Sequence, residues 1–83
     1  MKIVIVGCGK IGTAIATELN LEEHDISVVD INHDAVTRLA DSIDVMGIEG
    51  NGATYEVLEE AGAETADLVI AATARDVRLI DSK

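Results

Sequence analysis

The chain contains no proline, no tryptophan and no phenylalanine, and its one aromatic residue is Tyr55. We therefore expect an aliphatic core. A single cysteine, Cys8, cannot form an intrachain disulfide, which agrees with a reducing compartment. The hydrophobic content of 48% is typical of a globular chain and excludes a mainly disordered one. Eighty-three residues form at most one small domain, whose stability should depend on a partner or ligand.

Basic residues are also scarce. Six Lys and Arg stand against sixteen Asp and Glu, so the formal net charge is −10, and no basic cluster occurs. This composition argues against nucleic acid or an anionic membrane surface as a partner. No apolar run approaches the roughly 18 residues that span a bilayer, and no signal-peptide pattern precedes the first strand. We expect a cytoplasmic domain that does not insert into the membrane.

The first thirty residues contain a complete motif for phosphate binding. An unbroken β-branched run at residues 3–6 suits a parallel strand covered on both faces, and a G-x-G-x-x-G turn follows at Gly7, Gly9 and Gly12. The first glycine permits a sharp turn, the second a close approach of pyrophosphate to the backbone, and the third close helix packing. The N–H groups and dipole of the following helix bind a diphosphate, to which Lys10 adds charge.

The second predicted strand, residues 26–29, leads to Asp30, twenty-one residues after Gly9. A carboxylate at this place accepts both ribose hydroxyls of an adenosine and repels a 2′-phosphate. The predicted ligand is NAD(H) or an adenine nucleotide such as ATP or ADP, and not NADP(H). The alternative is that Asp30 only ends the strand or caps the helix that starts near Asn32.

The rest of the chain alternates helix and strand. Asn32 and Thr54 are good N-cap residues, and Gly62 suits the C′ position of the helix before it. Further strands are predicted over residues 44–48 and 68–72. The apolar stripes of the three predicted helices are Ile11, Ala14, Ile15 and Leu19; Val36, Leu39 and Ala40; and Val57, Leu58 and Ala61.

Right-handed crossovers applied to this series predict a Rossmann-like, doubly wound parallel α/β sheet with four main strands in the order 3-2-1-4. Ligand should bind at the carboxyl edge, where the strand order reverses. Compared with the complete six-stranded fold this sheet is truncated. We expect a nucleotide-binding domain over residues 1–74 and a tail over 75–83, a helical turn or short strand that ends the chain or begins a missing second half.

Five segments carry a family resemblance, at residues 2–12, 28–32, 50–54, 58–63 and 66–73. The first two are common to many dinucleotide-binding proteins. The Gly-Asn-Gly-Ala-Thr turn and the Leu-Glu-Glu-Ala-Gly-Ala segment are more specific. Together they resemble the N-terminal RCK or KTN domain, also called TrkA-N, of TrkA-type regulatory proteins of potassium uptake systems.

The resemblance implies a cytoplasmic regulator, held at the inner face of the membrane by a potassium transporter subunit. Such a domain binds NAD(H) or ATP/ADP and switches the transporter through a conformational change in a homodimer or higher oligomer. The residues that would surround the nucleotide are Gly7, Cys8, Gly9, Lys10, Ile11, Gly12, Asp30, Ile31, Asn32, Asn51, Gly52, Ala72 and Thr73.

Catalysis finds little support in the sequence. His24 and His33 lie in polar segments, no His/Cys cluster has the spacing of a metal site, and Tyr55 lies near a helix start, where a partly exposed ring is expected. The thiol of Cys8 could sense oxidation, but a small residue between two glycines is the simpler interpretation. We predict that the chain is not an enzyme. The alternative is the cofactor-binding half of an NAD-dependent dehydrogenase.

Overall fold

Strands and short helices alternate along the chain, as the sequence predicts. The computed structural model describes residues 1–52, 54–72 and 77–82, the last of these as backbone. The elements in order are β1 (Lys2–Val6), α1 (Lys10–Asn20), β2 (Asp25–Asp30), α2 (His33–Ser42), β3 (Met46–Glu49), α3 (Tyr55–Glu60), a short 3-10 helix η1 (Ala63–Thr65), β4 (Leu68–Ala72) and β5 (Val77–Ser82).

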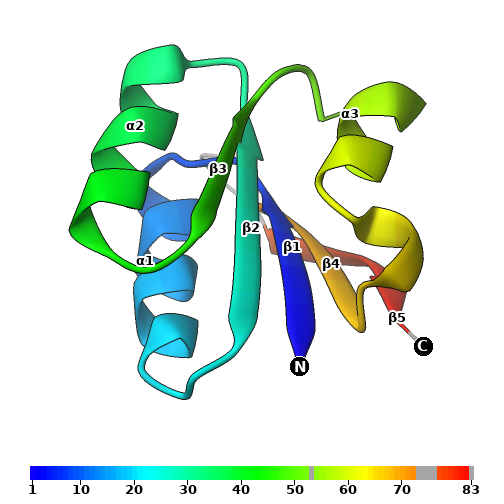
Figure 1. Ribbon diagram of the computed structural model, residues 1–83, viewed down its shortest axis with the longest axis horizontal. Coiled ribbons are helices and arrows are strands. Elements are labelled where there is room, and N and C mark those ends of the chain that lie inside the picture. Colours follow the sequence, from blue (N-terminus) through cyan, green and yellow to red (C-terminus); the bar gives the residue numbers. More distant parts are fainter. Residues whose placement is uncertain (53, 73–76, 83) are drawn as a thin grey trace.

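The strands form one sheet in the order β3-β2-β1-β4-β5. The first four are parallel, so the predicted Rossmann-like α/β fold and its strand order 3-2-1-4 are confirmed. Strand β5 pairs antiparallel with β4. Of the two alternatives predicted for the tail, a helical turn or a short strand, the structure contains the short strand. Helices α1 and α2 lie on one face of the sheet and α3 lies on the other (Figure 1).

Two aliphatic clusters fill the space between the sheet and its helices, which confirms the expected core. Alternate residues of β1 point to opposite faces, so Ile3 and Ile5 join the cluster under α1 and α2, whereas Val4 joins the cluster under α3. All three are at most 1% exposed. Ile3, Val4 and Ile5 therefore form the centre of the domain, and the glycine-rich turn directly follows their strand.

The predicted helix ends are also confirmed. The Asn32 side chain accepts a hydrogen bond from Ala35 N at 3.1 Å, and the Thr54 hydroxyl accepts one from Val57 N at 3.4 Å. Gly62 follows the last turn of α3 in the left-handed conformation, with φ +87°. Local capping chemistry thus sets where α2 starts and where α3 starts and ends.

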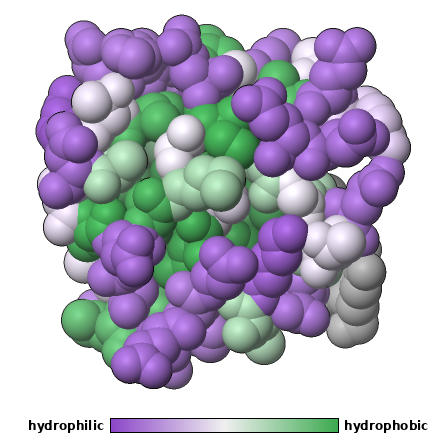
Figure 2. All heavy atoms as spheres, viewed as in Figure 1, coloured by the Kyte–Doolittle hydropathy of each residue, from purple (hydrophilic) through white to green (hydrophobic). Residues whose placement is uncertain are grey.

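The third strand starts two residues later than the predicted span of 44–48. Ile43 and Val45 pack against the cluster under α1 and α2, and the ladder with β2 begins only at Met46. Strand β3 lies at the edge of the sheet, and Met46 is 59% exposed. In the view onto this edge, apolar side chains show in the middle of the face, with hydrophilic ones around them (Figure 2). None of the helices in the described part of the chain has the length and apolar character that a bilayer crossing requires.

Candidate functional site

The turn after β1 requires glycine at its first position. Gly7 has φ +113°, and a Cβ added there would lie 2.1 Å from Ala72 O of the neighbouring strand. The Gly7 N–H donates to Val29 O at 2.7 Å, which ties the turn to β2. At Gly12 an added Cβ would lie 1.9 Å from Gly7 O, so α1 packs directly against the turn. The predicted roles of these two glycines, sharp turning and close helix packing, are confirmed.

Helix α1 begins differently from α2 and α3. Its N-cap residue is Gly9, which has no side chain to accept hydrogen bonds from the first helical turn. An added Cβ at Gly9 would meet no atom within 4 Å, so the space beside it is open. Lys10 is the exposed first residue of the helix. An anion placed here could occupy the position that capping side chains take in the other two helices.

Asp30 joins the glycine-rich turn to the start of α2. Its Oδ2 accepts a hydrogen bond from Cys8 N at 2.6 Å, and its Oδ1 accepts one from Asn32 N at 2.9 Å. The capping of α2 itself is carried out by Asn32. Each carboxylate oxygen can accept a second hydrogen bond. The half-buried carboxylate is therefore fixed in place and retains capacity for two further donors.

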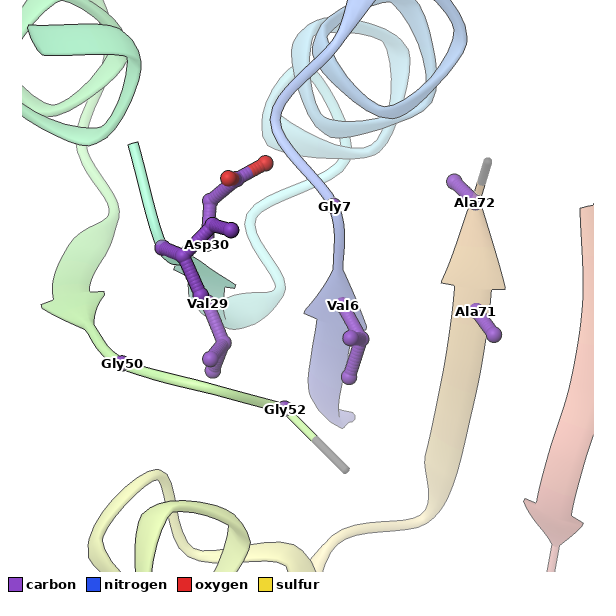
Figure 3. A pocket seen from close by; sticks show the side chains of 9 residues that line it. Val6, Gly7, Val29, Asp30, Gly50, Gly52, Ala71 and Ala72 are labelled. Atoms are coloured by element: carbon purple, nitrogen blue, oxygen red, sulfur yellow. The ribbon is translucent and has the colours of Figure 1, made fainter. Parts of the chain in front are cut away.

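A cavity of about 240 Å³ opens at the carboxyl edge of the sheet. The residues that line it are Val6, Gly7, Val29, Asp30, Ile31, Gly50, Gly52, Ala71 and Ala72. Figure 3 shows how they converge from the ends of β1, β2 and β4 and from the segment after β3. This is the edge at which the strand order reverses, and the sequence predicts that the ligand binds there.

The cavity contains part of the predicted set of binding residues. Gly7, Asp30, Ile31, Gly52 and Ala72 line it. The remaining predicted residues that the structure describes lie outside its lining: Cys8, Gly9, Lys10, Ile11, Gly12, Asn32 and Asn51. Thr73 is outside the described residues.

Four lining residues were absent from the predicted set: Val6, Val29, Gly50 and Ala71. Three of them are the last or penultimate residues of their strands, and Gly50 directly follows β3. The signal that could have found them is their place at the carboxyl ends of parallel strands.

The lining combines apolar walls with one charged group. Val6 and Ala71 contribute partly exposed aliphatic surface, Val29 is fully buried, and Ile31 is 71% exposed at the rim. Asp30 is the one lining residue, among those described, with a titratable side chain. The volume is below the roughly 300–1,000 Å³ of sites that hold a whole drug-sized ligand. Such a cavity suits one apolar portion of a ligand, such as a base, next to a hydroxyl-bearing portion at the carboxylate.

Cys8 is buried between the turn and the sheet, at 5% exposure. Burial, and then the negative charge of Asp30, raise the pKa of its thiol from 9.0 to about 11. Because the thiolate is the reactive form, the thiol is inert at neutral pH. This supports the structural interpretation of Cys8 as a small residue that fills the turn.

Cys8 should therefore react slowly with Ellman's reagent at pH 8 in the folded chain. The raised pKa lowers the thiolate fraction about 100-fold relative to a thiol of pKa 9, and burial lowers access further. The reaction should become fast in denaturant. Equal rates in folded and denatured protein would contradict the described environment of Cys8.

The other candidate polar residues lie away from the cavity lining. The Tyr55 hydroxyl donates to Glu64, and hydrogen bonds with Glu64 and Glu59, followed by the Glu64 charge, raise its pKa to about 12. His33 is exposed, and its ring contacts Glu49. Within residues 1–52, 54–72 and 77–82, no group of three or more His, Cys, Asp and Glu is arranged to hold a metal ion.

Comparison with known proteins identifies the family. The family described as the TrkA-N domain matches residues 3–80. Trk system potassium uptake protein TrkA of Azorhizobium caulinodans is 42% identical over 76 residues, which are 92% of this chain and 17% of that protein. The TrkA homolog of Pyrococcus abyssi is 36% identical over 92% of this chain and 34% of its own length. The chain thus spans only a minor part of the curated relatives it matches.

A solved structure shares the fold. The Shewanella denitrificans Kef CTD in its AMP-bound form superposes with a TM-score of 0.69 and 25% sequence identity, covering 83% of this chain and 40% of that one. Since the family match covers nearly the whole chain and the curated relatives extend over 92% of it, this chain belongs to the TrkA-N domain family.

Proposed function

We propose that this chain is the nucleotide-sensing domain of a potassium uptake regulator. It binds NAD(H) or ATP/ADP, adenine nucleotides with an unphosphorylated 2′-hydroxyl, and it is not an enzyme. The observation that carries the proposal is the contact between Asp30 and the glycine-rich turn, at 2.6 Å from the Cys8 amide, beside an apolar cavity. The ribose would bind at the carboxylate, the base in the cavity, and the phosphates at the start of α1.

The charge distribution of the chain supports binding of the phosphates at the start of α1. The chain has a formal net charge of −10, so a polyanionic ligand needs a local source of positive potential. The uncapped N-terminus of α1 and the exposed Lys10 supply it. The residues that would contact the phosphates are those of the predicted turn, from Gly7 to Gly12. Asn32 would contact the ribose together with Asp30, and Asn51, Gly52 and Thr73 would border the adenine or the remaining phosphate edge.

The partner would be a membrane potassium transporter subunit, and the domain would act on it from the cytoplasm. The names of the relatives, potassium uptake proteins, support this assignment, and the AMP bound to the Kef CTD supports an adenine nucleotide. Occupancy of the site would reach the transporter through a conformational change within a homodimer or higher oligomer. Coupling of this kind requires that the nucleotide binds the two conformations with different affinity.

A thermal-shift panel tests the ligand assignment. AMP, ADP, ATP, NAD, NADH and NADP are added separately to the chain, and the melting temperature is measured. A ligand at 100 times its Kd stabilises the folded state by about 2.7 kcal/mol, which corresponds to a rise of roughly 10–20 °C for a domain of this size. We expect such rises with the adenine nucleotides whose 2′-hydroxyl is unphosphorylated, and none with NADP at equal concentration.

Two results would contradict the proposal. An equal rise in melting temperature with NADP and NAD would contradict the role given to Asp30. No rise with any nucleotide would contradict the proposed nucleotide site. Hydride transfer between NAD and a simple hydroxy acid would favour the dehydrogenase alternative. The panel uses the full chain, so it requires no assumption about other domains.

A further inference from the structure

One wall of the cavity is formed by Asp30 and Ile31, the first two residues of the segment 30–33 that leads from the end of β2 into α2. Its second residue, Ile31, presents an exposed apolar side chain at the cavity rim. The Asp30 carboxylate holds the first end of the segment through the Cys8 and Asn32 amides.

His33, the first residue of α2, makes two contacts at the other end of the segment. Its Nδ1 lies 2.9 Å from Glu49 Oε1, and its Nε2 lies 3.4 Å from the hydroxyl of Thr37, one turn further along α2. With the proton on Nδ1, the ring donates to the carboxylate and accepts from the hydroxyl, so both ring nitrogens have a partner. The ring is thus fixed from its own helix and from a strand sixteen residues away.

Glu49 connects this contact to a second wall of the cavity. It is the last residue of β3 and lies beside Asp30 in the ladder between β2 and β3. The next residue, Gly50, lines the cavity, and its N–H donates to Asp30 O at 2.9 Å. The contact between His33 and Glu49 therefore ties the two lining segments together outside the cavity.

We propose that His33 and Glu49 are positioning residues for the nucleotide, and we name their contact the His33–Glu49 clasp. The clasp holds in place the two segments that carry the lining residues Ile31 and Gly50. It does not touch the ligand. This inference rests on the proposed function, because it assigns a role to residues that surround the same site.

The test measures AMP affinity by calorimetry for the full chain and its variants, with the free energy of unfolding measured in parallel. His33→Ala and Glu49→Ala should each weaken AMP binding about two- to fivefold, the size expected for an exposed pair. The double variant should bind no more weakly than either single one, because the two side chains act together. Additive losses, or unchanged affinity in both single variants, would overturn the proposal.

Two further variants separate positioning from a general loss of stability. His33→Asn keeps an N–H near the place of Nδ1 and should restore most of the affinity lost in His33→Ala. Tyr55→Phe removes a comparable exposed contact, that with Glu64, away from the cavity lining, and should leave affinity unchanged. If Tyr55→Phe weakens AMP binding as much as His33→Ala does, the effect is not one of the clasp.

Amide hydrogen exchange without ligand distinguishes failure of the clasp from failure of the proposed function. In His33→Ala, the amides of Asn32 and Gly50, which both donate to Asp30, should exchange about two- to fivefold faster, with those of β1 unchanged. Unchanged exchange in the segment would overturn the clasp even if AMP binds. If the unaltered chain binds none of the adenine nucleotides of the thermal-shift panel, the proposed function and the positioning role are both overturned, whatever the exchange rates.

Discussion

Replacing Gly7 with alanine should lower the free energy of unfolding by about 3 kcal/mol or more. A backbone φ of +113° is strained for any residue with a side chain, and the new Cβ would lie 2.1 Å from the Ala72 carbonyl oxygen. That oxygen belongs to the central sheet and cannot move aside cheaply. A small domain is stable by only roughly 5–15 kcal/mol, so much of the chain's stability is lost. Urea denaturation followed by circular dichroism measures the effect.

Gly9→Ala is the matched control, two residues along the same turn. The backbone at Gly9 has φ −74° and ψ −164°, which other residues adopt, and an added Cβ meets no atom within 4 Å. Its free energy of unfolding should change by less than about 1 kcal/mol. AMP affinity should nevertheless fall more than tenfold, because the methyl group would stand where the phosphate approaches the backbone. Equal destabilisation by the two substitutions would contradict the described turn.

The sequence predicted the sheet well because its signals are local. The β-branched run of β1, the caps at Asn32 and Thr54, and Gly62 each depend on the backbone conformation of a few neighbouring residues. The right-handedness of the crossover connections then selects a single order for the four parallel strands. The start of β3 was less accessible to this reasoning, because the packing of Ile43 and Val45 under α2 competes with strand pairing.

The candidate site was predictable at its centre and less so at its walls. Gly7 and Asp30 belong to a motif with fixed spacing. Val6 and Val29 read as ordinary core residues, because aliphatic side chains carry no binding chemistry of their own and only their place at the carboxyl ends of parallel strands marks them. The contact of His33 with Glu49 joins residues sixteen positions apart and belongs to no motif. Only the ladder register, which sets Asp30 beside Glu49, brings it into reach.

Replacing Asp30 with alanine should lower the affinity for NAD and AMP about 10- to 100-fold or more. A hydrogen bond to a charged group contributes about 1.5–3 kcal/mol, and the carboxylate can accept one from each ribose hydroxyl. The substitution should also destabilise the free chain by about 1–3 kcal/mol, because the Cys8 and Asn32 amides lose the oxygens that they now contact. Calorimetric titration and urea denaturation of the same variant measure the two effects.

Asp30→Asn separates charge from hydrogen bonding. Both carboxylate oxygens of Asp30 accept backbone N–H groups, at 2.6 and 2.9 Å, and an amide has only one oxygen to offer. One backbone donor must then face the amide NH₂, so the variant should be destabilised although its side chain has the same shape. Its discrimination against NADP should fall as well, since a neutral amide does not repel a 2′-phosphate. The ratio of NAD to NADP affinity should therefore move toward one in both variants. A ratio that stays at the value of the unaltered chain would show that the selectivity arises elsewhere, and Asp30 would then be a structural link between two loops.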